Sequence, residues 1–219
     1  MDKRKITIAE FLNQCRLRII NSIEDRTIKQ TVAHFGYTSE RLEQGLTLLD
    51  TSTVLCDTYD KEFGDLSAVF EQRIKEQVIA EQQYKKHQAI ARVALKDKAA
   101  AVVTLQLNAR TPRTLSGWIN QSRSFYNNLL ENKQWLDAMA KFTISKQQLK
   151  QGLNLIKNVE SYAEVIMREK GDAQDATIKR DIKLEELSEW VDDYESIAKL
   201  ALHDLPQLLK KLGITKKKK

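Results

Sequence analysis

Apolar residues recur along the start of the chain at the three- and four-residue steps of an α-helix. The stripe begins at Thr7-Ile8-Ala9-Glu10, where a threonine followed three residues later by a glutamate forms a capping box that opens a helix. Its members are Ile8, Phe11, Leu12, Cys15, Ile19, Ile20 and Ile23. The polar run 24–27 predicts the end of this helix, and a short second helix then runs to about His34.

The next apolar stripe follows a turn at Phe35-Gly36-Tyr37. Thr38 or Ser39 caps a helix that we expect to run to about Phe63. Gly64-Asp65 places a residue typical of helix C-termini before one typical of N-caps, which predicts a hairpin and a further helix to about Leu95. The alternative is one helix that continues through Gly64 at a cost of about 1 kcal/mol.

The same pattern returns after 107 residues without a gap. Phe35-Gly36-Tyr37-Thr38 aligns with Phe142-Thr143-Ile144-Ser145, Glu62-Phe63-Gly64-Asp65 with Glu169-Lys170-Gly171-Asp172, and Ile90-Ala91-Arg92 with Ile197-Ala198-Lys199. A fixed period of this kind indicates a repeat architecture. We therefore expect one helical repeat over 6–107, a linker over 108–114, a second repeat over 113–214 and a basic tail over 215–219.

The predicted fold class is all-α. Each repeat of about 107 residues should hold two short helices and a long helical hairpin, and the repeats should pack as a pseudo-two-fold helical bundle, with two separate bundles as the alternative. Gly45 and Gly152 fall on the apolar side of predicted helices, where a missing side chain allows close approach of another helix. Leu105 and Leu212 are expected to be the apolar anchors that end the two repeats.

Composition agrees with a soluble helical protein. Gly (7) and Pro (2) are scarce and 42% of residues are apolar, enough for a packed core. No apolar run is long enough to span a membrane, and the polar residues that follow the charged N-terminus break up any signal-peptide core. Cys15 and Cys56 have no cysteine counterparts in the second repeat, so we expect buried free thiols and a cytoplasmic location.

The net charge of +6 is confined to the end of the chain. Lys210, Lys211 and Lys216, Lys217, Lys218 and Lys219 supply six of the 36 basic residues, and the remaining 30 balance 30 acidic ones. A solvated tail that aids solubility is one interpretation. Contact with nucleic acid or another anionic surface through Lys216–Lys219 is the other.

Motifs for catalysis or metal binding are missing from the sequence. None of His34, His87 and His203 follows a glutamate by three residues, as the di-metal sites of helical bundles require. The sequence also lacks Cys-x-x-Cys, His-Glu-x-x-His and a glycine-rich phosphate loop. We therefore predict no catalytic residue, no metal, no cofactor and no enzymatic activity.

Polar residues that recur at equivalent positions are the candidate sites. They are Asn13/Asn120, Gln14/Gln121, Arg16/Arg123, Glu62/Glu169, Arg73/Arg180 and Asp97/Asp204. One interpretation is structural: hydrogen bonds and ion pairs that fix the register of neighbouring helices. The other is a pair of related ligand sites, one in each repeat.

Aromatic residues gather at the start of the second repeat. Trp118, Phe125, Tyr126 and Trp135 fall at helical spacing, where Phe11, Arg18, Ile19 and Ile28 stand in the first repeat. Core packing is the expectation, and a partly exposed aromatic patch for a partner protein is the alternative.

One resemblance covers nearly the whole chain. The segments around Phe35, Leu42 and Gly45, then Ile90-Ala91-Arg92, and then Trp118-x-x-Gln121-x-Arg123-x-Phe125-Tyr126 resemble a set of uncharacterised bacterial all-helical proteins with the same internal duplication. The resemblance implies a fold and a bacterial source, and no activity.

Together these observations favour a non-enzymatic helical scaffold or adaptor that acts by protein–protein contact or self-association. The alternatives are binding of nucleic acid or an anionic surface through the lysine tail, and binding of a small ligand where the repeats meet.

Overall fold

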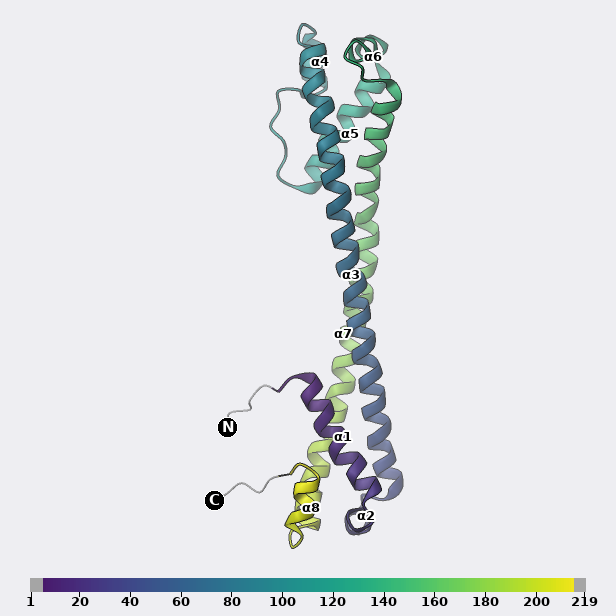
Figure 1. Cartoon of the computed structure of the whole chain (residues 1–219), viewed down its shortest axis with the longest axis vertical. Helices are drawn as coiled ribbons and strands as arrows, with labels where there is room; N and C mark the ends of the chain where they lie inside the picture. The colour runs from purple at the N-terminus through teal and green to yellow at the C-terminus, as the bar shows by residue number, and fades with distance from the viewer. Residues whose placement is uncertain (1–5, 215–219) are drawn as a thin grey trace. The chain divides into compact units, whose positions relative to one another are not determined.

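The computed structural model describes residues 6–214, and helices are the only regular structure within them. In order they are α1 (Ile8–Glu24), α2 (Arg26–Ala33), α3 (Ser39–Ala94), α4 (Ala99–Thr104), α5 (Leu115–Glu131), α6 (Lys133–Ala140), α7 (Lys146–Ala201) and α8 (Pro206–Lys211) (Figure 1). The predicted all-α class is confirmed. The basic tail with Lys216–Lys219 lies outside the described residues.

The helices of the second half have the same lengths as those of the first. Helices α1 to α4 contain 17, 8, 56 and 6 residues, and α5 to α8 contain 17, 8, 56 and 6. Each helix also begins 107 residues after its counterpart, as Ile8 and Leu115 illustrate. The sequence period and the helix boundaries therefore coincide.

Side-chain caps explain where the short helices begin. Thr7 and Glu10 form the predicted capping box, with N–O distances of 2.9 and 3.2 Å. Asp25 ends α1 and caps α2, because its carboxylate accepts hydrogen bonds from the backbone of Thr27 and Ile28. Thr114 caps α5, because its hydroxyl accepts a hydrogen bond from the backbone of Gly117.

The predicted hairpin at Gly64-Asp65 is wrong. Helix α3 continues through Gly64, and α7 continues through Gly171. A Cβ atom at either glycine would meet nothing within 4 Å, so neither glycine is needed for a turn or a close contact. A single exposed glycine costs a helix only about 1 kcal/mol, which the good helix formers on both sides offset.

The chain divides into two compact units, each built from both predicted repeats. Unit 1 contains the residues up to Phe63 and those from Asp172 onward, so it holds α1, α2, α8, the first part of α3 and the last part of α7 (Figure 1). Its buried residues include Cys15, Ile19, Ile28, Val32, Leu42, Leu49, Leu187, Val191, Tyr194, Ala198, Leu202 and Leu212. Helices from the two ends of the sequence thus share one core.

Unit 2 is the continuous segment Gly64–Gly171. Helices α4, α5 and α6 pack there with the last part of α3 and the first part of α7 (Figure 1). Its core includes Tyr84, Ala91, Leu95, Leu105, Trp118, Phe125, Tyr126, Leu129, Met139, Leu149 and Ile156. Leu105 here and Leu212 in unit 1 are buried, which confirms both as apolar anchors.

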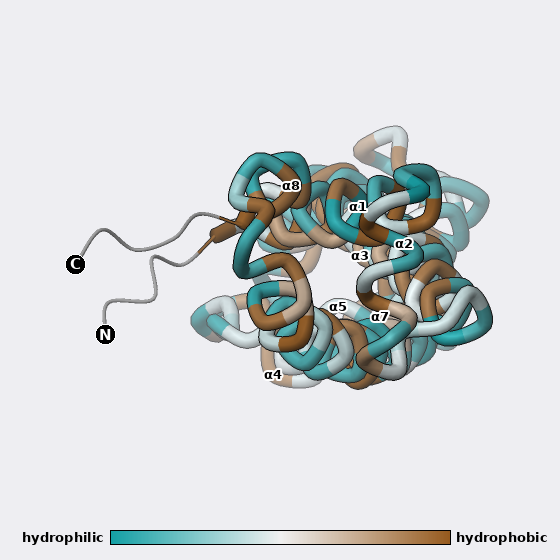
Figure 2. The backbone as a smooth tube through the Cα atoms, turned by 90° about the horizontal axis from the view of Figure 1, so that it is seen from below, coloured by the Kyte–Doolittle hydropathy of each residue, from teal (hydrophilic) through white to brown (hydrophobic). Residues whose placement is uncertain are grey.

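Polar and apolar residues alternate around the helices, as Figure 2 shows by colour. Gly45 and Gly152 lie on the packed sides, where a Cβ would come within 2.5 Å of Trp190 and Tyr126 respectively. The predicted close approach is therefore made by an aromatic side chain in each unit.

Despite their 56 residues, α3 and α7 carry charged side chains throughout. No helix in the described part of the chain is both long and apolar enough to cross a membrane.

Candidate functional site

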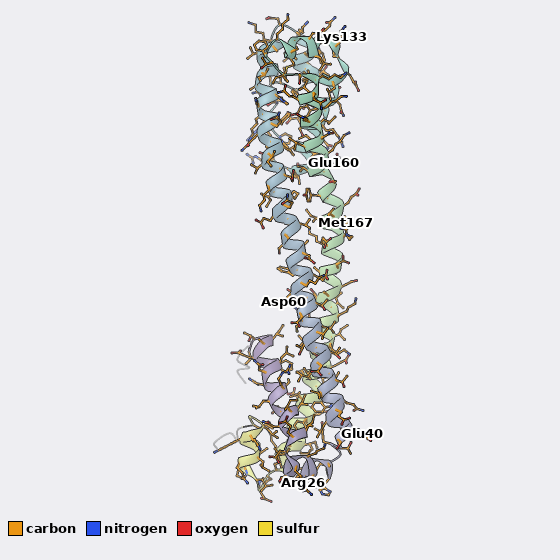
Figure 3. The ribbon with its side chains drawn as sticks, turned by 45° about the vertical axis from the view of Figure 1, so that its right-hand side comes forward. Arg26, Glu40, Asp60, Lys133, Glu160 and Met167 are labelled. Atoms are coloured by element: carbon orange, nitrogen blue, oxygen red, sulfur yellow. The ribbon has the colours of Figure 1, made fainter. Side chains whose placement is uncertain are left out.

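The recurring residues of α1 and α5 have different surroundings. Asn13, Gln14 and Arg16 are exposed on α1 and form no hydrogen bond or ion pair with other side chains among residues 6–214. On α5, by contrast, Arg123 pairs with Glu160 of α7 at 2.5 Å and donates to the Asn120 side chain at 2.9 Å. Glu160, labelled in Figure 3, aligns with Thr53, which offers Arg16 no carboxylate.

Gln121 is buried on the same helix as Arg123. Its Nε2 donates to the backbone oxygen of Arg110 at 3.5 Å, and its Oε1 has no hydrogen-bond partner in the described structure. Gln121 therefore ties α5 to the segment that precedes it.

Three of the four acidic members of the candidate set, Glu62, Glu169 and Asp204, pair with their immediate neighbours. Glu62 pairs with Lys61 at 3.0 Å, and Glu169 with Arg168 at 3.1 Å. Asp97 is exposed, and Asp204, also exposed, lies 2.9 Å from His203 Nδ1. None of these pairs joins two helices, so they do not explain the register of the helices.

The aligned arginines Arg73 and Arg180 also differ. Arg73 donates to Gln77 one turn further along α3, at 2.5 Å. Arg180 donates twice to Asp181, at 2.8 and 2.7 Å, while its guanidinium lies 3.9 Å from the centre of the Tyr59 ring of α3. Burial by itself lowers the pKa of Arg180. Its hydrogen bonds to Asp181 and Tyr59 outweigh this effect, so the pKa of the guanidinium lies above its ordinary value.

Arg180 belongs to a pocket of about 270 Å³ in unit 1, which we call the α1–α3–α7 pocket. Its lining consists of Ile8, Ala9 and Leu12 from α1, Thr53, Cys56, Asp57, Tyr59 and Asp60 from α3, and Arg180 from α7. Asp60 is labelled in Figure 3. Residues of both predicted repeats therefore meet in this pocket.

The pocket lining combines apolar side chains with two exposed carboxylates, those of Asp57 and Asp60, which we call the rim. Asp57 and Asp60 are exposed and make no ion pair within the described residues, whereas Arg180 is already bound to Asp181. Burial raises the pKa of Cys56, so its thiol is protonated at neutral pH. The pocket can thus hold an apolar or cationic group, but it contains no activated nucleophile.

Unit 2 contains a buried polar cluster around His87 of α3. The imidazole Nδ1 lies 3.0 Å from the Tyr126 hydroxyl, and Nε2 lies 3.0 Å from Gln83 Nε2. With the amide of Gln83 donating to Nε2, Nδ1 carries the proton and donates to Tyr126. Burial, with a smaller contribution from Lys86, lowers the pKa of His87 to about 4. The histidine is therefore neutral and structural at physiological pH.

Sequence reasoning missed this cluster. His87 follows Tyr84 by three residues and precedes Ala91 by four, so it lies on the same helix face as core residues. That spacing could have identified His87 as buried, but its partner Tyr126 lies 39 residues away. The aromatic residues themselves agree with the expectation, since Trp118, Phe125 and Tyr126 are buried and Trp135 packs against the same core.

Both cysteines are free, as expected. Cys15 is fully buried and Cys56 is half-buried. Burial raises the pKa of Cys15 to about 12, against a smaller opposing influence of Arg18.

Comparisons with family models, with curated proteins and with solved structures find no match.

Proposed function

We propose that this protein is a non-enzymatic helical scaffold or adaptor that works by contact with another protein chain or with a second copy of itself. The observation that carries the proposal is the presence of about half-exposed apolar side chains that share helix faces within the described part of the chain. A cytoplasmic location and the resemblance to bacterial helical proteins remain parts of this proposal.

The first apolar pair lies on α3 within unit 2. Ile74 and Val78 are 52% and 49% exposed and stand four residues apart, so they share one helix face. The ion pairs Lys75–Glu71 and Lys85–Glu81 flank them at 2.9 and 3.4 Å. Apolar centres with charged rims are typical of protein interfaces.

The second apolar pair lies on α7 within unit 1. Ile178 and Ile182 are 49% and 53% exposed and again stand four residues apart. They align with Glu71 and Lys75, whereas Ile74 and Val78 align with Asp181 and Glu185. The two units therefore expose different helix faces, which favours distinct contacts for each unit.

The titratable groups support a function other than catalysis. Loss of solvent contact raises the pKa of the fully buried Cys15 thiol and of the half-buried Cys56 thiol, which disfavours the reactive thiolate. His87, with a pKa of about 4, is neutral and hydrogen-bonded inside the core, where it cannot exchange protons with a substrate.

Tandem duplication with pseudo-two-fold packing is the architectural part of the proposal. Its support is the 107-residue sequence period and the helix boundaries that repeat with that same period. A duplicated scaffold offers two related units whose surfaces can diverge independently.

Site-specific photo-crosslinking in the cells of origin tests the proposed contacts. A benzophenone amino acid placed at Val78 or at Ile182 should form defined adducts with a protein chain, because both positions are exposed and apolar. The matched control is Gln72, an exposed polar position that lies on another face of α3. Equal or absent crosslinking at all three positions would contradict the proposal.

The glutamate variants Ile74→Glu/Val78→Glu and Ile178→Glu/Ile182→Glu sharpen the same test. Each double variant should abolish crosslinks on its own face and leave those of the other face unchanged. Circular dichroism should be unaltered, since all four side chains are exposed.

A further inference from the structure

We propose that the α1–α3–α7 pocket of unit 1 binds a small organic cation: an amine joined to a compact apolar body. This inference concerns a ligand rather than a protein partner, and it does not rest on the proposed scaffold function.

The apolar body would contact the apolar side chains of the lining. Leu12 is half-buried beside Ile8, and the Tyr59 ring provides an aromatic wall that is further supported by stacking on Phe63, with ring centres 5.9 Å apart. A volume of about 270 Å³ suits a single ring or a short alkyl group. The protonated thiol of Cys56 adds a weakly polar surface without charge.

The charge of the ligand follows from the rim. Asp57 and Asp60 are three residues apart on α3, so they lie on neighbouring positions of one helix face. Arg180 is the cation of the lining, and its guanidinium is already engaged by Asp181 and by the Tyr59 ring. The two rim carboxylates thus remain available for an ammonium group, whereas an anion would meet uncompensated negative charge.

The aligned positions in unit 2 lack this combination. Thr53 is replaced by Glu160, whose carboxylate is taken up by Arg123, and Asp60 is replaced by Met167, which is 77% exposed (Figure 3). Ala163 stands in place of Cys56. Position 163 therefore serves as a matched control for position 56 within the same chain.

Cys56 allows the pocket to be tested by thiol–disulfide exchange on the full-length protein. The probes are three symmetric disulfides: cystamine, the disulfide of 4-(aminomethyl)benzyl thiol and the disulfide of 4-(mercaptomethyl)benzoate. Each exchange converts the Cys56 thiol to a mixed disulfide and releases one probe thiol. Intact-mass and peptide mass spectrometry measure the labelled fraction, and fully buried Cys15 is the internal control.

The aryl amine should label Cys56 at least about fivefold more than the aryl carboxylate, the size of effect expected for exposed ion pairs. Labelling by the aryl amine should also exceed labelling by cystamine, because only the aryl probe has a ring that can contact the apolar lining. Asp57→Asn/Asp60→Asn should remove the preference for the cation while leaving circular dichroism unchanged, since both carboxylates are exposed.

The same probes on Cys56→Ala/Ala163→Cys provide the control for general surface charge. A smaller preference at position 163 is expected. Equal labelling of Cys56 by the amine and the carboxylate, no advantage of the aryl amine over cystamine, or the same preference at position 163 would each overturn the proposal.

Discussion

Each unit has an aromatic ring packed against one of two aligned glycines, and the rings come from different helices. In unit 1, Gly45 of α3 faces Trp190 of α7, and in unit 2 the aligned Gly152 of α7 faces Tyr126 of α5. A Cβ at either glycine would lie 2.5 Å from ring atoms. The gap left by the glycine is therefore common to both units, whereas the helix that supplies the ring is not.

The buried hydroxyl groups differ in the same way. In unit 2 the Tyr126 hydroxyl pairs with His87, and in unit 1 Tyr194, which aligns with His87, pairs its hydroxyl with Ser22. Each unit thus satisfies one buried aromatic hydroxyl by a side chain from another helix. Only in unit 2 does the partner take up a proton in acid, because His87 has a pKa of about 4, whereas the Ser22 hydroxyl of unit 1 does not titrate in this range.

Acid should therefore act on unit 2 first, and this is the largest effect we expect. The pKa of His87 is about 4 in the folded chain, against an ordinary value of 6.5 that applies to the unfolded chain. Between these pH values the unfolded chain takes up a proton that the folded chain does not. The contribution of neutral His87 to the free energy of unfolding is therefore full above pH 6.5. It falls by about 3 kcal/mol as the pH drops to 4. Hydrogen exchange by peptide, corrected for pH, should show the loss within Gly64–Gly171.

His87→Gln is the control for this acid effect. Glutamine should remove the additional loss between pH 6.5 and 4 and leave the titration of the carboxylates. An unchanged pH dependence in this variant would show that His87 is not the group responsible.

Filling the glycine gap should have the next largest effect in both units. Gly45→Val and Gly152→Val should each lower the free energy of unfolding by about 2 kcal/mol, because an aromatic ring that packs in the core, Trp190 or Tyr126, must move. Gly64→Ala, where a Cβ meets nothing within 4 Å, should instead raise it by about 0.5–1 kcal/mol. Urea unfolding measures all three, and equal effects at Gly45 and Gly64 would contradict the packing described.

Removing the paired hydroxyls should destabilise the two units to different extents. Tyr126→Phe leaves His87 Nδ1 without a partner and should cost about 1–2 kcal/mol. Tyr194→Phe should cost less, since the Ser22 hydroxyl also donates to the backbone oxygen of Arg18 at 2.6 Å. Thermal unfolding of both variants tests the order, and a larger loss for Tyr194→Phe would reverse the comparison.

The smallest difference between the two units is expected in the coupling energy of their ion pairs. Arg18–Glu195 in unit 1 has side chains 12% and 21% exposed, whereas Arg123–Glu160 in unit 2 has side chains 40% and 41% exposed. Double-mutant cycles with alanine should give a coupling of about 1 kcal/mol for the first pair and about 0.5 kcal/mol or less for the second. Raising the salt concentration should weaken the second more strongly.

Local signals in the sequence were enough to predict much of the helix pattern. The capping box at Thr7, the break near Asp25 and the turn at Gly36 depend on residues within one helical turn, and Gly36 adopts a φ of 88° as a turn residue. The 107-residue period likewise predicted equivalent helices. The error at Gly64 arose because a glycine signals a helix end only when the surrounding residues also stop the helix.

Features of the candidate sites that depend on distant neighbours could not be predicted. Arg123 meets Glu160 at a sequence separation of 37 residues, and Arg180 stacks on Tyr59 of another helix. The α1–α3–α7 pocket likewise combines residues from both ends of the chain. The recurrence of a polar residue identified positions, but the partners of the arginines at two of these positions, Arg16/Arg123 and Arg73/Arg180, differ between the predicted repeats.

Native mass spectrometry of the full chain isolated from its own cells tests the central claim most directly. The scaffold account predicts a mass that includes a further protein chain, either a second copy or a partner. It also predicts that Ile74→Glu/Val78→Glu or Ile178→Glu/Ile182→Glu releases the single chain. A single chain without any bound protein, unchanged by these substitutions, would contradict the account.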